Sequence, residues 1–286
     1  MILCLNYISC FSRLFIGVGI DPYVPEQIRD YFESISGLKS SIRGSFLYYH
    51  NRDTIVLVGY PIIGEFREEE FVEVLEKLRL DVRGRLVVIA PKLPSIFTFE
   101  NVKKDSYFRV KLPLVLKSKK LRYMVSRAER DLVIEVGRSL SREHFNLVNI
   151  FLSRSGVEEY MKFVCSRLDR YLASSQTAYV INAYNKSGRL IGFDIVDFAS
   201  TRYSFYMFNF IDRGEGYVPG VSDILFYKLV QLSQEYGKQY VNMGLGVNEG
   251  VRKFKLKWGA EEFLPYFYGE ITKKKLVDLF EFFLRF

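Results

Sequence analysis

Hydrophobic positions along this chain follow two periods, one typical of helices and one typical of strands, and the two alternate. Apolar residues three and four positions apart predict helices over residues 25–36, 68–78, 116–132, 143–151, 157–172, 222–236 and 251–258, with another over 272–286. Short apolar or alternating runs predict strands at 15–20, 45–50, 54–60, 86–90, 107–112, 177–184, 190–198, 203–211, 240–243 and 262–271. This order predicts an α/β protein with a mixed central sheet flanked by helices.

The chain is long enough for two domains, and we place the boundary near residue 115. Its 286 residues, of which 49% are hydrophobic and 16% aromatic, can bury a substantial core. Residues 1–115 form one unit. Residues 116–286 form a second unit, which begins with a basic helix over 116–132 that bridges the two. In the second unit two helices, three antiparallel strands, and then helix, strand and helix follow one another.

The stretch 218–260 carries the strongest local signals. Pro219 and Gly220 form a turn, and Ser222 and Asp223 follow where a helix takes an N-cap and a first-turn acid. A helix that begins behind a glycine turn offers free N–H groups to a phosphate. The alternative is an ordinary packing unit of helix, strand and helix with a solvated basic face.

The second half of this stretch adds a glycine turn and a basic helix. Gly244 and Gly246 come just after a short strand and free the backbone there. Val251, Phe254 and Trp258 then recur with helical spacing, which predicts one apolar face. Basic side chains lie on the other face: Arg252, Lys253 and Lys257.

The run GVNEGVRKFKLKWG, from Gly246 to Gly259, resembles the second half of a GNAT acyltransferase fold. It is most similar to the FemAB-like branch, which includes peptidoglycan-bridge and lipid aminoacyltransferases. The basic helix LRYMVSRA, which starts at Leu121, is similar to a helix of that branch. The resemblance implies tandem GNAT-like halves, of which the second is the better defined. With Gly220 as the first glycine of the family's phosphate loop, Ser222 stands where that loop has Gly or Ala.

The resemblance also implies a site where the middle strands diverge. Tyr206 would be a proton donor, Asp223 a base, and Asn242 a hydrogen-bond partner of the acyl chain. As alternatives, Tyr206 is a core aromatic residue and Asp223 stabilises a helix start. The donor would be bound by residues of the loop, the glycine turn and the last helix of the motif: Val218, Gly220, Val221, Ser222, Gly244, Gly246, Asn248, Lys253 and Lys257.

The net charge indicates the type of binding partner, and the cysteine content indicates the cellular compartment. A formal net charge of +8 at pH 7 favours an anionic partner, with solubility alone as the alternative. Cys4, Cys10 and Cys165 show no zinc spacing, so we expect no metal, and so sparse a set is typical of the reducing cytoplasm. The apolar start over 1–20 lacks a basic leader and is interrupted by polar residues. It predicts core strands rather than a signal peptide or a membrane span.

The sequence leaves three functions to consider, of which we expect the first, with acyl-CoA as the donor. The first is a GNAT-type N-acyltransferase that moves an acyl group from acyl-CoA, such as acetyl-CoA, to an amine acceptor. The second is a FemAB-like aminoacyltransferase that uses aminoacyl-tRNA, with basic side chains on the phosphates. The third is a non-catalytic binding module on a GNAT scaffold. An acceptor at a membrane surface or on a lipid fits the first two, and we expect no DNA partner.

Overall fold

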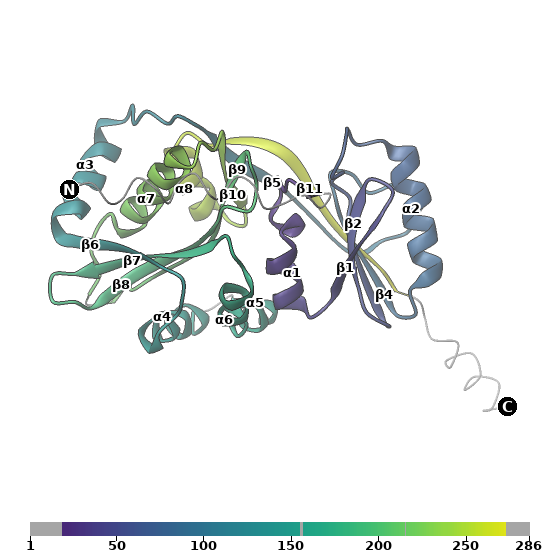
Figure 1. Ribbon diagram of the computed structural model, residues 1–286, viewed down its shortest axis with the longest axis horizontal. Helices are drawn as coiled ribbons and strands as arrows, with labels where there is room; N and C mark the ends of the chain where they lie inside the picture. The colour runs from purple at the N-terminus through teal and green to yellow at the C-terminus, as the bar shows by residue number, and fades with distance from the viewer. Residues whose placement is uncertain (1–18, 155–156, 215, 273–286) are drawn as a thin grey trace.

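The computed structural model describes residues 19–154, 157–214 and 216–272, and its strands form one continuous eleven-stranded sheet (Figure 1). In order across the sheet these are β1 (Lys39–Arg43), β2 (Phe46–His50), β3 (Thr54–Val58), β4 (Arg85–Ala90), β11 (Glu261–Thr272), β5 (Glu100–Lys111), β10 (Tyr240–Leu245), β9 (Tyr203–Ile211), β8 (Leu190–Asp197), β7 (Ala178–Asn185) and β6 (Leu132–Gly137). The sheet is mixed, as the sequence predicts, because β3–β4 and β9–β10 are parallel and the other neighbours are antiparallel.

Helices cover both faces of this sheet (Figure 1). Over the second half, α3 (Lys119–Asp131) packs on α7 (Val221–Glu235), and α7 packs on β7, β8 and β9. The remaining helices are η1 (Pro25–Gln27), α1 (Arg29–Ser36), α2 (Glu68–Asp81), α4 (Arg142–Leu152), α5 (Glu159–Cys165), α6 (Leu168–Ser174) and α8 (Glu249–Lys257). Within the described residues, no helix combines the length and the apolar character that a membrane crossing requires.

The two halves repeat one unit and exchange strands. In each half a helix connects two parallel neighbours: α2 joins β3 to β4, and α7 joins β9 to β10. The strand β5 of the first half pairs with β10 of the second, while β11 of the second half lies between β4 and β5. The predicted units 1–115 and 116–286 therefore share one sheet.

The parallel strands β3 and β4 of the first half stay paired, whereas β9 and β10 of the second half separate. In the first half β3 pairs with β4 from Thr54 to Val58, along its whole length. The next residue, Gly59, faces Ala90 and the ring of Phe71 so closely that an added Cβ would lie 2.6 Å from each. Packed side chains therefore fill the place where the second half has a cavity.

Most of the predicted elements are confirmed, with boundaries shifted by a few residues. The hairpin β2–β3, the amphipathic helix α2 and the antiparallel set β7–β8–β9 lie where the sequence predicts them. The strand β5 begins seven residues before the predicted start at 107, at Glu100. The predicted strand at 15–20 and helix at 272–286 fall almost wholly outside the described residues, as do Cys4 and Cys10.

Three predictions about elements are wrong. The helix expected over 157–172 is two helices, α5 and α6, because Arg167 leaves the helical conformation with φ −126° and ψ 9°. The helical period over 157–172 also predicts that Tyr160 and Phe163 face the core, whereas they are 55% and 46% exposed. The sequence also missed the strands β1 and β6 at the sheet's edges. Finally, α7 takes Gly220 as its N-cap, with φ +91°, instead of Ser222.

Candidate active site

A cavity lies where β9 and β10 separate. The two strands pair in parallel as far as Phe205 and Asn242, whereas β9 continues to Ile211 and β10 to Leu245. The cavity has a volume of about 450 Å³ and is bounded by these strands and the start of α8. A concave site with apolar walls and a few polar groups is the usual form of a binding site for a small ligand.

The divergence of β10 has a local cause at Asn242. The pairing of β10 with β5 shifts between Asn242 and Gly244, and Gly244 takes the left-handed φ of +72°. The Gly244 N–H donates to Asn242 Oδ1 at 2.7 Å, and Asn242 Nδ2 donates to the carbonyl of Tyr23 at 2.8 Å. Asn242 is fully buried and shapes this bulge, so its amide is engaged away from the cavity walls.

The cavity walls are aromatic and sulfur-bearing, with polar groups at a few points. The apolar lining comes mainly from β9, β10, α4, α5 and α8: Phe151, Met161, Tyr206, Met207, Phe208, Phe210, Met243, Leu245, Val251 and Phe254. The polar and charged side chains on the wall are Arg154, Asn209, Arg213, Ser222, Asn248 and Lys255. Every charged side chain on this wall is a cation.

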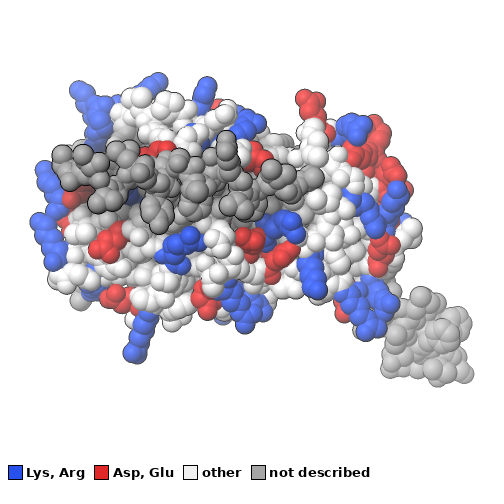
Figure 2. Space-filling model, in the orientation of Figure 1, with Lys and Arg blue, Asp and Glu red and all other residues white. Residues whose placement is uncertain are grey.

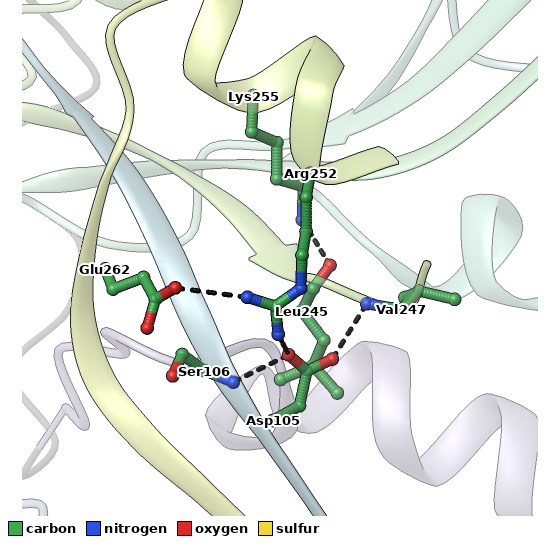
Figure 3. Close-up of polar contacts among 7 residues, drawn as sticks. All are labelled: Asp105, Ser106, Leu245, Val247, Arg252, Lys255 and Glu262. Carbon is green, nitrogen blue, oxygen red and sulfur yellow. Dashed lines mark hydrogen bonds and ion pairs between the residues drawn. The ribbon is translucent and has the colours of Figure 1, made fainter. Parts of the chain in front are cut away.

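Lys255 is the only lysine among the described residues that line the cavity, and it is buried. The residue is 2% exposed, and its ammonium donates to the carbonyl of Leu245 (Figure 3). The ammonium also lies 5.3 Å from the centre of the Phe108 ring. Burial lowers the pKa of Lys255 to about 7, with the charge of Asp105 acting in the opposite direction. The amine is therefore able to gain and lose a proton near neutral pH.

An ion-pair cluster fixes the helix that carries Lys255. The Arg252 guanidinium binds Asp105 on β5 and donates to Glu262 on β11 at 3.1 Å (Figure 3). Asp105 also accepts from the N–H of Val247 at 2.7 Å, in the turn before α8. Asn248 caps α8 by accepting from the Val251 N–H at 3.0 Å. These contacts from two strands, β5 and β11, hold α8 at one orientation over the cavity.

Two arginines at the cavity lack an acidic partner in the described part of the chain. Arg154 donates to the carbonyl of Ile211 at 3.2 Å. Arg213 lies two residues after Ile211 and is exposed. Burial and the neighbouring charge of Arg213 lower the pKa of Arg154. Two cations that repel each other across a cavity wall favour an anion between them.

The basic residues predicted to bind the donor are engaged with acids instead. Lys257 Nζ lies 2.5 Å from Asp223 Oδ1, and Lys253 Nζ lies 2.6 Å from Glu249 Oε1. Asp223 is 5% exposed and also accepts from Trp258 Nε1 at 3.1 Å. Asp223 thus joins α7 to α8 and does not line the cavity.

The predicted loop residues divide between the cavity and the packing of helices. Ser222, Gly244 and Asn248 line the cavity. Gly220 instead faces α3, where an added Cβ would lie 2.8 Å from the Met124 carbonyl oxygen. The other members pack elsewhere: Val218 and Val221 in the core beside α7, and Gly246 against Asp105 and Arg252.

Tyr206 lines the cavity, and the neighbouring strand β8 carries a buried carboxyl group. The Tyr206 ring packs on Phe226 with centroids 5.3 Å apart, and burial raises the pKa of its hydroxyl. Asp194, fully buried, accepts from Asn209 Nδ2 at 2.6 Å, while its Oδ2 has no hydrogen-bond partner. Ser222 Oγ lies 3.3 Å from Asn209 Oδ1, so a polar chain connects Asp194 to the cavity wall.

Sequence reasoning missed Lys255, Arg154 and Arg213. For Lys255 a signal was available, because it lies four residues after Val251 and three before Trp258, on the apolar face of α8. A lysine on the apolar face of a helix is expected to be buried, or to extend its side chain through the core toward a polar group. No pattern marked the two arginines, which the fold brings together from the end of α4 and the end of β9. Among the described residues, no three His, Cys, Asp or Glu side chains are placed to hold a metal ion.

Comparison of the sequence with known proteins finds one short similarity and no family. No protein-family model matches the chain. A 120-residue stretch is 32% identical to the membrane-bound lytic murein transglycosylase F of Aeromonas salmonicida, covering 33% of this chain and 24% of that protein. The matched stretch thus spans about a quarter of that relative, and it carries no argument about the cavity.

Solved structures are similar over most of the chain. L-PGS from Bacillus licheniformis has a TM-score of 0.53 at 18% identity, covering 92% of this chain and 97% of that one. FemX has a TM-score of 0.55 at 9% identity, covering 84% and 90%. A tandem GNAT protein from the clavulanic acid biosynthesis pathway has a TM-score of 0.50 at 13% identity, covering 79% and 78%. The predicted fold of tandem GNAT-like halves, with a mixed central sheet flanked by helices, is confirmed.

Proposed function

We propose that this chain is an acyltransferase that moves an acyl or aminoacyl group from an anionic carrier to an amine. The observation that carries the proposal is Lys255, a buried amine with a pKa of about 7 on the wall of the cavity between β9 and β10. A GCN5-related N-acetyltransferase from Kribbella flavida, whose structure is similar with a TM-score of 0.51 at 11% identity, supports a transferase.

The reaction needs one proton to move from the nucleophile to the leaving group. The acceptor amine attacks the acyl carbon, the new C–N bond forms, and the bond from that carbon to the carrier breaks. Neutral Lys255 accepts the proton that the amine loses and returns it to the departing carrier atom, so that it is unchanged at the end. The aromatic walls exclude water, which would otherwise compete with the amine for the acyl group.

Charge placement supports an aminoacyl-tRNA as the carrier. Among the described residues, the cations at the cavity without an acidic partner are Arg154 and Arg213. Lys253, Lys257 and the start of α7 already face carboxylates. The basic side chains of α3 form no ion pair within the described residues, and Figure 2 shows cations along the edge of the molecule where α3 lies. This pattern favours a long polyanion.

Acyl-CoA is the second candidate carrier. Ser222 and Asn248 line the cavity at the beginnings of α7 and α8, where a GNAT donor would lie. The close packing of Gly220 on α3 leaves that side of the glycine no room for a phosphate, which is why we place this carrier second.

Replacing Lys255 tests the transfer step. Lys255→Met keeps the bulk of the side chain, and removing one acid–base group lowers a rate by roughly 100-fold or more. We expect this loss in a transfer assay with charged tRNA and an amine, with carrier binding retained. In the wild type the rate should rise with pH through about 7, as Lys255 loses its proton. Lys253→Met, which breaks an exposed ion pair, is the matched control and should keep the rate. A Lys255→Met protein with wild-type transfer would refute the proposed role.

Replacing Arg154 and Arg213 tests the carrier. Binding of total tRNA should weaken on addition of salt, and the slope of log K against log [salt] should fall by about 1 for each phosphate contact removed. We therefore expect Arg154→Ala with Arg213→Ala to reduce that slope by about 2. Lys253→Ala with Lys257→Ala should change it less, because both lysines are paired. Stabilisation by acetyl-CoA that survives salt, with no effect of tRNA, would instead establish the second carrier.

A further inference from the structure

The cavity between β9 and β10 connects two separate parts of the hydrophobic core. Tyr206 and Phe254, on its wall, pack on the core residues of α3 and α7. Four other wall residues pack on the core residues of α4, α5 and α6: Phe151, Met161, Met207 and Phe208. We call these four side chains the methionine pocket. They form the side of the cavity to which α4 and α5 contribute.

The side chains of the methionine pocket leave apolar surface uncovered, since all four are half-buried. The Phe151 ring packs edge-on against Phe210 with centroids 5.4 Å apart, and Phe210 stacks on Phe208 at 6.2 Å. These rings are held by packing, whereas a methionine side chain adapts to the shape of what it contacts. A ligand that covers this surface with apolar groups gains the free energy of removing it from water.

The charges around the methionine pocket disfavour a cationic ligand group. No aspartate or glutamate among the described residues lines the cavity, and the charged side chains on its wall are Arg154, Arg213 and Lys255. An ammonium or guanidinium group in the pocket would therefore lose its hydration without gaining a carboxylate partner. The two arginines would also repel it. The pocket consequently fits an uncharged group.

The methionine pocket adjoins the arginines at which we place the carrier. The Arg154 guanidinium lies 5.8 Å from the centre of the Phe151 ring, so a phosphate bound at Arg154 brings its carrier beside the pocket. Lys255 belongs to the other part of the wall, because its ammonium lies near the ring of Phe108, in the core beneath α3 and α7. An amine that attacks from that side can pass its proton to Lys255.

We propose that the methionine pocket holds the side chain of the transferred aminoacyl group, and that this side chain is large, apolar and uncharged, as in phenylalanine. The choice of ligand rests on the proposed function, which places the carrier at the arginines. A cavity of about 450 Å³ has room for such a side chain beside the reacting atoms. Met161 and Met207 are then specificity-determining residues, which select a large apolar side chain over a small or a cationic one.

Calorimetric titration with three small probes, without a carrier, tests the methionine pocket. The probes are the N-acetyl amides of phenylalanine, alanine and lysine. We expect the wild type to bind the phenylalanine probe at least about tenfold more tightly than the alanine probe, because only the former buries an aromatic ring. The lysine probe should bind no more tightly than the alanine probe. Equal binding of all three probes by the wild type would overturn the proposal.

A carboxylate placed in the pocket should change this order. Met161 is half-buried on α5, and Met161→Glu puts an acid on the cavity wall. We expect this variant to bind the phenylalanine probe at least about tenfold more weakly than the wild type, and the lysine probe more tightly. Phe163→Glu is the matched control, because it adds the same charge to the same helix at an exposed residue away from the wall. It should keep the wild-type order, and a wild-type order in Met161→Glu would refute the pocket.

Met161→Ala distinguishes a lost ligand contact from a damaged fold. It adds no charge and should weaken binding of the phenylalanine probe several-fold, while leaving that of the alanine probe unchanged. Equal weakening of both would show that Met161 only supports the structure. Because the titration includes neither carrier nor transfer, the expected preference in a chain that transfers nothing would refute the proposed function alone. Transfer of phenylalanyl and lysyl groups from tRNA at equal rates would overturn the pocket alone.

Discussion

Asp194 and Lys255 are both buried beside the cavity, and burial shifts their pKa values in opposite directions. The pKa of Asp194 is raised well above its usual range, whereas that of Lys255 falls to about 7. In both cases the neutral form is favoured, since the protein interior solvates a charge poorly. A cavity with neutral buried groups and two free arginines presents its positive charge at Arg154 and Arg213, where we place the carrier.

The raised pKa of Asp194 predicts how stability changes with pH. The native state holds this proton more tightly than the unfolded chain, so the stabilisation is complete at low pH. It is lost as pH rises from about 4, the value of an exposed aspartate, toward the native pKa. Asp194→Asn cannot ionise and should lose this part of the slope, becoming more stable than the wild type toward neutral pH.

Urea unfolding midpoints in a series of pH values measure the effect of Asp194→Asn. Glu129→Gln, an exposed acid on α3, should follow the wild-type curve and serves as the control. Two parallel curves for wild type and Asp194→Asn would mean that Asp194 is charged in the native protein, with a cation that the contacts above do not include.

At the scale of elements, the contact between α3 and α7 depends on one glycine. Gly220 has φ +91°, and an added Cβ would lie 2.8 Å from the Met124 carbonyl oxygen and 3.3 Å from Ala128 Cβ. Gly237 has a similar φ of +67° with no atom within 4 Å of that position. Gly237→Ala therefore suffers only the backbone strain, about 1 kcal/mol. Gly220→Ala adds a steric clash worth about 1–3 kcal/mol more.

Thermal or urea unfolding of the two alanine variants compares these costs directly. The same loss of stability in both would show that α3 moves away from α7 without penalty. From the sequence, Gly220 was expected to approach a phosphate, so a substitution there would have been expected to act on carrier binding. The packing of Gly220 on α3 instead predicts that a substitution there mainly lowers the stability of the fold.

The elements that periodicity predicts correctly are those with one continuous buried face. In α2, for example, Phe71, Val74, Leu75 and Leu78 are all buried, as the spacing predicts. Periodicity failed where packing overrides local pattern. The apolar spacing continues from α5 into α6, yet the chain turns at Arg167. Lys255 was missed because a charged residue on an apolar face looks solvated until its surroundings are known.

The site could not be assembled from the sequence, because its parts come from distant segments. Asp105 and Arg252 are 147 positions apart. They meet because β5 of the first half pairs with β10, the strand that leads into α8. A single sequence contains no information on that exchange, although it contains enough to resemble the tandem fold.

At the scale of the whole molecule, the exchanged strands predict that neither half folds alone. Without residues 116–286, the first half loses β11 from between β4 and β5, and both strands expose an unpaired edge. Without residues 1–115, β10 loses β5 and β11 loses both neighbours. Unpaired edges of this length favour aggregation. We expect each fragment alone to lack cooperative thermal unfolding and near-UV circular dichroism, and an equimolar mixture refolded together to regain both.

The control for this experiment is the full chain cut after folding, within the connection 112–118 between β5 and α3. This cut leaves every strand pair in place, so the nicked protein should elute as one species and unfold in one transition. A cooperative transition in the isolated fragment 116–286 would show that the cavity between β9 and β10 needs no strand from the first half. Asp105, on β5 of the first half, would then be dispensable for building the cavity.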